Sequence, residues 1–329
     1  MRAVVEATAV VPFGGTTRFK SFPPGMGHIK VPITSRGAAA SALTLYAACR
    51  PRAVWMHRFA LAAIGVAGAR ALPGRAMPWE PPMGADPWRE LLAEWSARFG
   101  RFDDFAIGER SQRSRTGFSV LLLAQGRPRA FVKLRRGDHD ALHAEGVVIQ
   151  RMARFQPRSF TVPEPLGWGS VDEWGYLATA ALPSPRHRIP ESPPFGTLGA
   201  EIDLALRALP RPPETPGHWR PMHGDLTPWN LRQLPRGELV LFDWEDAAWA
   251  PPGADEVLYR ASLTALGGPH SGPCPDNEAV NFWLARVSGR KERTERDSRL
   301  DRSLCLTLAG MRSARAVPGE ALEAAVTRA

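Results

Sequence analysis

Two short segments constrain this chain of 329 residues more than any other feature. Residues 223–230 read HGDLTPWN, and residues 239–243 read LVLFD. If Arg236-Gly237 between them forms a two-residue hairpin turn, antiparallel pairing places Asn230 opposite Asp243. An amide oxygen and a carboxylate then converge, and hard oxygen ligands of this kind suit magnesium carrying the phosphates of a nucleotide. We therefore predict that Asn230 and Asp243 bind Mg²⁺.

Asp225 lies five residues before Asn230, in the loop that enters this predicted hairpin. A carboxylate in that position stands beside the metal without being one of its main ligands, and it can accept the proton of an attacking hydroxyl. We predict that Asp225 is the catalytic residue. His223 is better explained as a residue that braces the loop than as an acid or base.

Lys133 and Glu145 form the upstream part of the predicted site. Lys133 ends the sequence Ala-Phe-Val-Lys on a predicted strand, and Glu145 lies within the apolar stripe of a helix predicted over residues 140–155. An ionised carboxylate that faces a core needs a cation, and Lys133 is the natural candidate. The alternative is that Lys133 is a solvated strand residue and Glu145 a charge at the edge of the helix.

Together these segments resemble the aminoglycoside phosphotransferase and choline kinase family of the protein-kinase-like superfamily. The resemblance is carried by Phe131-Val132-Lys133, His143-Ala144-Glu145, the HGDLTPWN segment and Phe242-Asp243-Trp244-Glu245. It implies a two-lobed fold, ATP as donor, magnesium, and transfer of the γ-phosphoryl group to a hydroxyl. It also implies that the Lys133 ammonium, held by Glu145, is aimed at the α- and β-phosphates. The alternative is an idle kinase-like module that binds a nucleotide or a partner without chemistry.

The segment Gly108–Gly117 departs from the glycine-rich loop of protein kinases. Ser114 and Thr116 stand where glycines are expected, and we predict that the backbone amides there cradle phosphates. An ordinary solvated turn explains the segment equally well.

The order of the predicted elements indicates an α+β, two-lobed protein-kinase-like fold. Strands are predicted over 118–123, 130–134 and 176–182, and mostly helices follow a proline-rich joint near residue 183. We therefore predict an N-lobe with a small antiparallel sheet over residues 101–182 and a mainly helical C-lobe over 183–329. Asp255 is interpreted as a helix N-cap that also braces the catalytic loop, as the family resemblance suggests.

Residues 1–100 have no counterpart in the family pattern and are predicted to form an N-terminal helical extension. A weakly structured arm is expected over 1–36, followed by helices over 38–49 and 53–72, a proline-rich linker, and a helix capped by Asp86. The apolar sequence over 53–72 suggests a third interpretation, in which the extension contacts a protein or a membrane surface.

Composition limits the remaining function classes. The net charge of +9 comes from scattered arginines rather than from one basic helix, which argues against a nucleic-acid partner. Cys49, Cys274 and Cys305 are too few for a disulfide framework or a zinc site, so we expect a cytoplasmic protein. The apolar stretch 59–69 is too short for an integral membrane span.

The predicted acceptor is a hydroxyl of a small molecule. An aminoglycoside, a sugar and an amino alcohol all remain open. Glu245 and Asp246 follow the metal aspartate and either face the acceptor pocket, which would favour a cationic acceptor, or form a solvated acidic pair.

Overall fold

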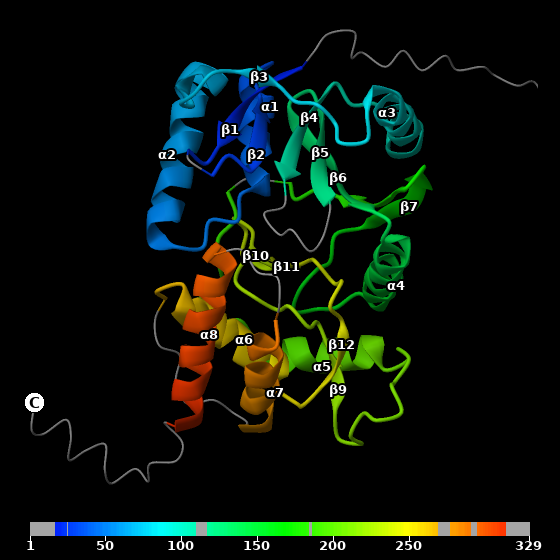
Figure 1. The fold of residues 1–329 in the computed structure, drawn as a ribbon, viewed down its shortest axis with the longest axis vertical. Helices are drawn as coiled ribbons and strands as arrows, with labels where there is room; N and C mark the ends of the chain where they lie inside the picture. Colours follow the sequence, from blue (N-terminus) through cyan, green and yellow to red (C-terminus); the bar gives the residue numbers. More distant parts are fainter. Residues whose placement is uncertain are drawn as a thin grey trace, which may run out of the picture.

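The computed structural model describes residues 17–24, 26–109, 117–183, 186–268, 277–290 and 295–313. Figure 1 shows two lobes, one built on a large sheet and the other mainly on helices, with α4 (His139–Phe155) beside the junction. The α+β, two-lobed architecture predicted from the sequence is confirmed.

In the described residues, eight strands form one antiparallel sheet in the order β3-β1-β2-β4-β5-β6-β8-β7. Its centre is β5 and β6, which pair Ser119 with Lys133. The strands are β1 (Arg18–Phe22), β2 (Ile29–Pro32), β3 (Met77–Pro78), β4 (Asp104–Glu109), β5 (Gly117–Ala124), β6 (Arg127–Arg136), β7 (Pro165–Val171) and β8 (Trp174–Ala180). The predicted strands over 118–123, 130–134 and 176–182 correspond to β5, β6 and β8.

Helices cover both faces of this sheet, which explains why β5 reads as a nearly continuous apolar run. Val120 and Leu122 point into a core shared with α3 (Ala85–Phe99), whereas Leu121 and Leu123 join a core shared with α1 (Arg36–Ala42) and α2 (Pro51–Ala67). The aromatic stripe of α3 is buried in the first core, through Trp88, Trp95 and Phe99. Two short 3₁₀ helices, η1 (Leu43–Leu45) and η2 (Gly68–Ala71), follow α1 and α2.

The tip of the β5–β6 hairpin lies beneath α1. Gln125 and Gly126 both have positive φ angles, 52° and 72°, as a two-residue hairpin turn of type I′ requires. The Ser41 hydroxyl donates to the Gly126 carbonyl at 2.7 Å. A Cβ atom added to Gly126 would lie 3.0 Å from the Gly37 Cα, so the hairpin tip and the start of α1 are in contact at these two glycines.

Two details of the extension differ from the sequence-based expectation. The weakly structured arm predicted over 1–36 contains β1 and β2, whose Phe22, Ile29 and Val31 are buried. These strands are only five and four residues long, too short to show a clear alternation, and glycine and proline fill the turn between them. The helix α3 begins after Gly84, and Asp86 lies in its first turn rather than at its cap.

The predicted boundary between residues 100 and 101 therefore crosses a continuous sheet, because β1 to β3 precede it and β4 follows it. As a division of the chain into domains, the boundary stays a prediction.

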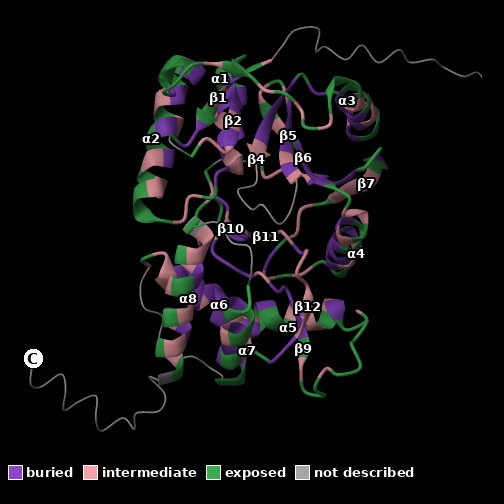
Figure 2. Cartoon of the chain, viewed as in Figure 1, coloured by how far each residue is buried: buried purple, intermediate pink, exposed green. Residues whose placement is uncertain are grey.

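The second lobe packs helices around two short, two-stranded antiparallel sheets. Its helices are α5 (Phe195–Leu206), α6 (Ala254–Ala265), α7 (Asn277–Ser288) and α8 (Glu295–Ser313). Its strands are β9 (Arg220–Met222), β10 (Leu231–Gln233), β11 (Leu239–Leu241) and β12 (Ala248–Ala250), paired as β10–β11 and β9–β12. Figure 2 shows buried residues along the inner faces of these helices. Among the described helices, none has the length and apolarity that crossing a membrane requires.

Candidate active site

The carboxylate of Asp255, in the first turn of α6, holds the loop between β9 and β10 in place. This carboxylate accepts the backbone N–H groups of His223 at 2.7 Å and Gly224 at 3.1 Å. The N-cap of α6 is Gly253, so the prediction that Asp255 caps this helix is wrong. The predicted contact of Asp255 with the loop is present. Its contacts with the backbone fix the start of the HGDLTPWN segment.

His223 is a buried structural residue of this loop. Its Nδ1 accepts the N–H of Asp225 at 3.1 Å, and its Nε2 lies 3.2 Å from the carbonyl of Phe242. Burial lowers the pKa of His223 to about 4, which keeps the ring neutral at pH 7. A neutral ring with the proton on Nε2 satisfies both contacts, and it agrees with the predicted bracing role.

Gly224 allows the loop to pass close to the segment after β11. Its φ angle is 85°, and a Cβ atom at this position would lie 1.8 Å from the carbonyl oxygen of Asp246. Only glycine fits there, because any side chain would meet backbone.

Asn230 orients Asp225. The Asn230 side-chain nitrogen donates to the Asp225 carboxylate at 2.8 Å and to its backbone carbonyl at 2.9 Å. The amide oxygen is then the atom that could bind a metal. Burial, and next the carboxylates of Asp243 and Asp246, raise the pKa of Asp225 to about 8.

The register of the β10–β11 hairpin differs from the predicted one by one residue. Leu231 pairs with Leu241, and the Phe242 N–H donates to the Asn230 carbonyl at 3.2 Å. Asn230 therefore lies opposite Phe242, and its predicted position opposite Asp243 is wrong. The cause is the length of the loop. The Leu234 N–H donates a hydrogen bond to the Glu238 carbonyl, so the loop between them contains three residues rather than two.

Lys133 joins the two lobes at the centre of the site. Its ammonium contacts both carboxylate oxygens of Glu145 at 2.7 Å and the carboxylate of Asp243 at 2.5 Å. Lys133 and Glu145 are both buried. The structure thus shows the predicted contact, and the alternative of a solvated lysine does not describe it. Asp243 reaches the ammonium from the other lobe, in a left-handed conformation with φ of 69°.

Glu245 lies on the same side as Lys133, at 3.3 Å from its ammonium. It also pairs with Arg135, which is buried two residues along the same strand and contacts Asp138 at 2.9 Å. Glu245 is therefore not a solvated charge, and the expectation that it faces an acceptor pocket stays a prediction. No pattern in the sequence indicates this partner, because Arg135 and Glu245 are brought together by the packing of the two lobes.

Three carboxylates meet in this cluster. Oxygen atoms of Glu145, Asp243 and Glu245 lie within 4.8 Å of one another and could hold a metal ion. An all-oxygen donor set fits magnesium. The sequence predicts Asp243 as a ligand and pairs Glu145 with the lysine, and both ligand assignments stay predictions; Glu245 is not among the ligands predicted from the sequence.

A cavity of about 210 Å³ opens between the lobes onto this cluster. Lys133, Glu145 and Asp243 line it from one side, and Thr44 and Ala47 of the extension line it from another. That contribution of the extension to the cavity was not predicted.

Arg232 and His187 bring polar groups into the same cavity. Arg232 is 1% exposed, its guanidinium contacts the Cys49 thiol at 3.6 Å, and no carboxylate among the described residues forms an ion pair with it. In the described part of the chain, the Arg232 Nε and the Thr44 hydroxyl are buried without a hydrogen-bond partner. Such a set of unpaired groups suits a ligand that supplies acceptor atoms.

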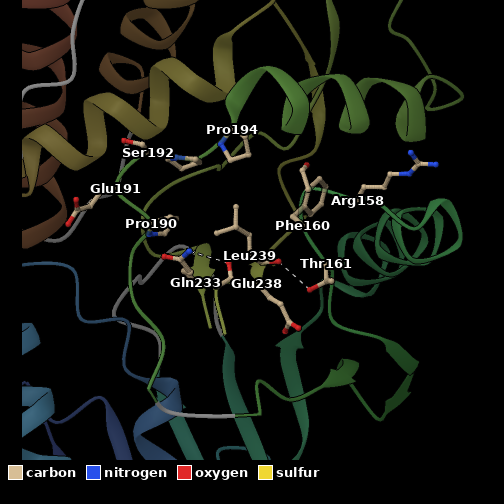
Figure 3. Close-up of a pocket in the computed structure, with 13 residues that line it drawn as sticks. Arg158, Phe160, Thr161, Pro190, Glu191, Ser192, Pro194, Gln233, Glu238 and Leu239 are labelled. Carbon is tan, nitrogen blue, oxygen red and sulfur yellow. Dashed lines mark hydrogen bonds between the residues drawn. The ribbon is translucent and has the colours of Figure 1, made fainter. Parts of the chain in front are cut away.

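A second cavity, of about 400 Å³, lies behind the β10–β11 hairpin (Figure 3). Phe160, Thr161, Pro190, Gln233 and Leu239 are among its lining residues, and Lys133, Asp225 and Asp243 are not. It is therefore separate from the candidate active site. Ser114 and Thr116, the predicted phosphate-cradling residues, lie outside the described residues.

Residues 180–270 match the sequence signature of a family described as the phosphotransferase enzyme family. This segment holds Asp225, Asn230 and Asp243. The chain carries a phosphotransferase signature. The resemblance predicted from the sequence is confirmed over this segment. A comparison with curated protein sequences gives no match.

Several solved phosphotransferases and kinases are similar to this chain in structure. A spectinomycin phosphotransferase in complex with ADP and spectinomycin is 9% identical, with 68% of this chain and 98% of that chain covered and a TM-score of 0.42. A putative fructosamine-3-kinase from Haemophilus somnus 129PT is 11% identical, covering 68% and 97%, with a TM-score of 0.43. An aminoglycoside-3'-phosphotransferase of type VIII is 17% identical, covering 68% and 100%, with a TM-score of 0.41.

Proposed function

We propose that this phosphotransferase-family chain transfers the γ-phosphoryl group of ATP, with magnesium, to a hydroxyl of a small molecule. One observation carries the proposal. Lys133 and Glu145 of the sheet lobe meet Asp243 of the helical lobe at one ammonium group, at the mouth of an interlobe cavity. A triphosphate needs this combination of a fixed cation and metal-binding oxygens.

Asp225 would act on the acceptor. Asn230 fixes its carboxylate in the loop. That carboxylate would orient the attacking hydroxyl and take its proton. Lys133 would orient the phosphates and offset part of their charge. Magnesium, when held by Asn230, Asp243 and the neighbouring carboxylates, would offset the remaining charge on the transferring group.

The finer points of the proposal rest on the residues and on the family resemblance. ATP is the donor that the resemblance predicts. The acceptor class covers aminoglycosides, sugars and amino alcohols, and no nucleic acid is proposed as a partner. We propose a reducing, cytoplasmic location because Cys49 and Cys305 are free thiols, while Cys274 lies outside the described residues.

The test separates binding from chemistry. We expect Asp225→Asn to keep Mg-ATP binding and to lose turnover by about 10²–10⁴-fold, because it loses the proton acceptor. We expect Asp243→Ala to lose both. Thermal shift with Mg-ATP measures binding, and transfer of labelled phosphate over a panel of acceptors measures turnover. Asp86→Asn, an exposed position in α3, is the matched control.

Equal turnover in the wild type and Asp225→Asn would contradict the proposed mechanism. Nucleotide binding without transfer to any acceptor in the panel would favour the idle kinase-like module instead.

A further inference from the structure

The outward face of α2 carries large apolar side chains that the described part of the chain leaves uncovered. Trp55 is 73% exposed, Phe59 74% and Val66 77%. Their spacings of four and seven residues place them on one side of the helix. The opposite side already supplies the core through Ala60 and Ile64. Figure 2 shows the exposed residues along the outer side of α2.

The same face is positively charged. Arg52 and Arg58 are exposed beside Trp55 and Phe59, and Arg70 is exposed just beyond the helix. No aspartate or glutamate occurs in residues 51–67. The face therefore combines aromatic rings with guanidinium groups and has no compensating acid.

The helix α3 shows what an ordinary surface helix of this chain looks like. Its exposed positions include Asp86, Arg89, Glu90 and Arg98, so both signs of charge are present and no large apolar side chain is exposed. The two helices cover opposite faces of the same sheet. The composition of α2 is thus a property of that helix and not of the chain's surface in general.

We propose that this face of α2 lies on the surface of an anionic lipid membrane. Basic helices with exposed aromatic residues bind at the boundary between headgroups and acyl chains, and arginines are attracted to anionic lipids. At 17 residues, α2 suits lying along the surface. A second copy of the chain fits less well, because a two-fold contact through this face would place cationic faces against each other.

Docking through α2 leaves the proposed active site open. None of residues 51–67 is among the residues that line the interlobe cavity. The inference therefore stands independently of the phosphotransfer proposal, and its test does not use activity as a readout.

The experiment is sedimentation of the full-length protein with vesicles. We expect binding to vesicles of equal parts phosphatidylcholine and phosphatidylglycerol, and little binding to pure phosphatidylcholine. Arg52→Gln/Arg58→Gln should lower the partition coefficient on the anionic vesicles by roughly tenfold or more, since each arginine near such a surface contributes about 1 kcal/mol. Trp55→Ala/Phe59→Ala should lower it by at least roughly tenfold through lost apolar burial.

Two controls match these variants. Leu204→Ala removes an exposed apolar side chain from α5, and Arg299→Gln removes an exposed arginine from α8. Neither should change binding by more than about twofold, since surface substitutions away from the contact are usually small in effect.

Three outcomes would overturn the proposal. The first is that the wild type does not bind anionic vesicles. The second is that Trp55→Ala lowers the thermal unfolding midpoint strongly, which would mean that another part of the chain covers the face. The third is that light scattering shows a dimer that Trp55→Ala abolishes, which would assign the face to a second copy.

Discussion

At the scale of single residues, Arg232 brings a positive charge into the interlobe cavity, where no described carboxylate pairs with it. A buried charge without a partner costs several kcal/mol, and replacing it by an apolar residue of similar length is often stabilising. We expect Arg232→Met to raise the free energy of unfolding of the ligand-free protein by about 1–3 kcal/mol and to weaken Mg-ATP binding. Urea unfolding and thermal shift with Mg-ATP measure these effects.

Arg299→Met is the control for that substitution, because Arg299 is exposed and its ion pair among the described residues is with Glu295 on its own helix. A lower stability of Arg232→Met than of the wild type would show that Arg232 is already compensated in the folded chain.

His187 makes the free energy of unfolding depend on pH. Burial, followed by the charge of Arg232, lowers the pKa of His187 to about 3, against 6.5 in the unfolded chain. Because the unfolded state binds the proton first, the stabilisation from neutral His187 is complete above pH 6.5 and decreases as pH falls toward 3. We expect the wild type to lose about 1–2 kcal/mol more than His187→Gln between pH 7 and pH 5.

Urea unfolding at the two pH values tests this expectation, with the exposed His218→Gln as the matched control. Identical pH dependence in the wild type and His187→Gln would contradict it.

The sequence predicted some of these residues better than others. Glu145 can be predicted because an acid within an apolar stripe needs a cation, and Lys133 on the preceding strand is the candidate. Arg135 and Glu245 left no such signal, since each looks like an ordinary surface charge until the lobes pack together. Arg232 lies between the apolar residues Leu231 and Leu234, and this position is the signal from which a buried arginine could be predicted.

At the scale of elements, the path of the loop between β9 and β10 depends on Gly224. A methyl group there would collide with the Asp246 backbone, so the loop or the segment after β11 must move. We expect Gly224→Ala to lower stability by about 1–3 kcal/mol and to reduce phosphotransfer strongly, because Asp225 follows directly. Unfolding and transfer assays measure the two effects.

Gly199→Ala is the control at this scale. Gly199 lies within α5 and has nothing within 4 Å of the added methyl group. We expect it to be stabilising by about 0.5–1 kcal/mol with unchanged activity. Full activity of Gly224→Ala would mean that the loop does not need its present path.

Hairpin register was the element-scale property that the sequence could not settle. Arg236 and Gly237 are predicted as turn residues, but a loop of two and a loop of three residues use similar residue types. The difference moved the partner of Asn230 from Asp243 to Phe242. The strands β1 and β2 do not follow from the sequence for a related reason, since strands of four or five residues are defined by their neighbours more than by their own pattern.

At the scale of the whole molecule, the first hundred residues are part of the fold of the sheet lobe. The strand β2 pairs with β4, and the core of α1 and α2 includes Leu121 and Leu123 of β5. We expect a chain that begins at Asp86 to lose cooperative unfolding, because this core would be exposed and the edge of β4 unpaired. Circular dichroism during thermal unfolding is the measurement.

In the full-length chain, Ile29→Ala tests the same core without removing any segment. We expect a loss of about 2–5 kcal/mol, as for other buried isoleucines. A cooperative transition in the shortened chain would instead show that the residues before Asp86 are not needed for the fold of the sheet lobe.

The contact between the β5–β6 turn and α1 also determines where the molecule can be tagged. Hairpin tips normally accept inserted epitopes or fluorescent labels. Here Gly126 contacts Gly37, and its carbonyl accepts a hydrogen bond from the Ser41 hydroxyl. An insertion at this tip would therefore separate α1 from the sheet. The exposed loop around Gly217, where nothing lies within 4 Å of an added atom, is the better attachment point.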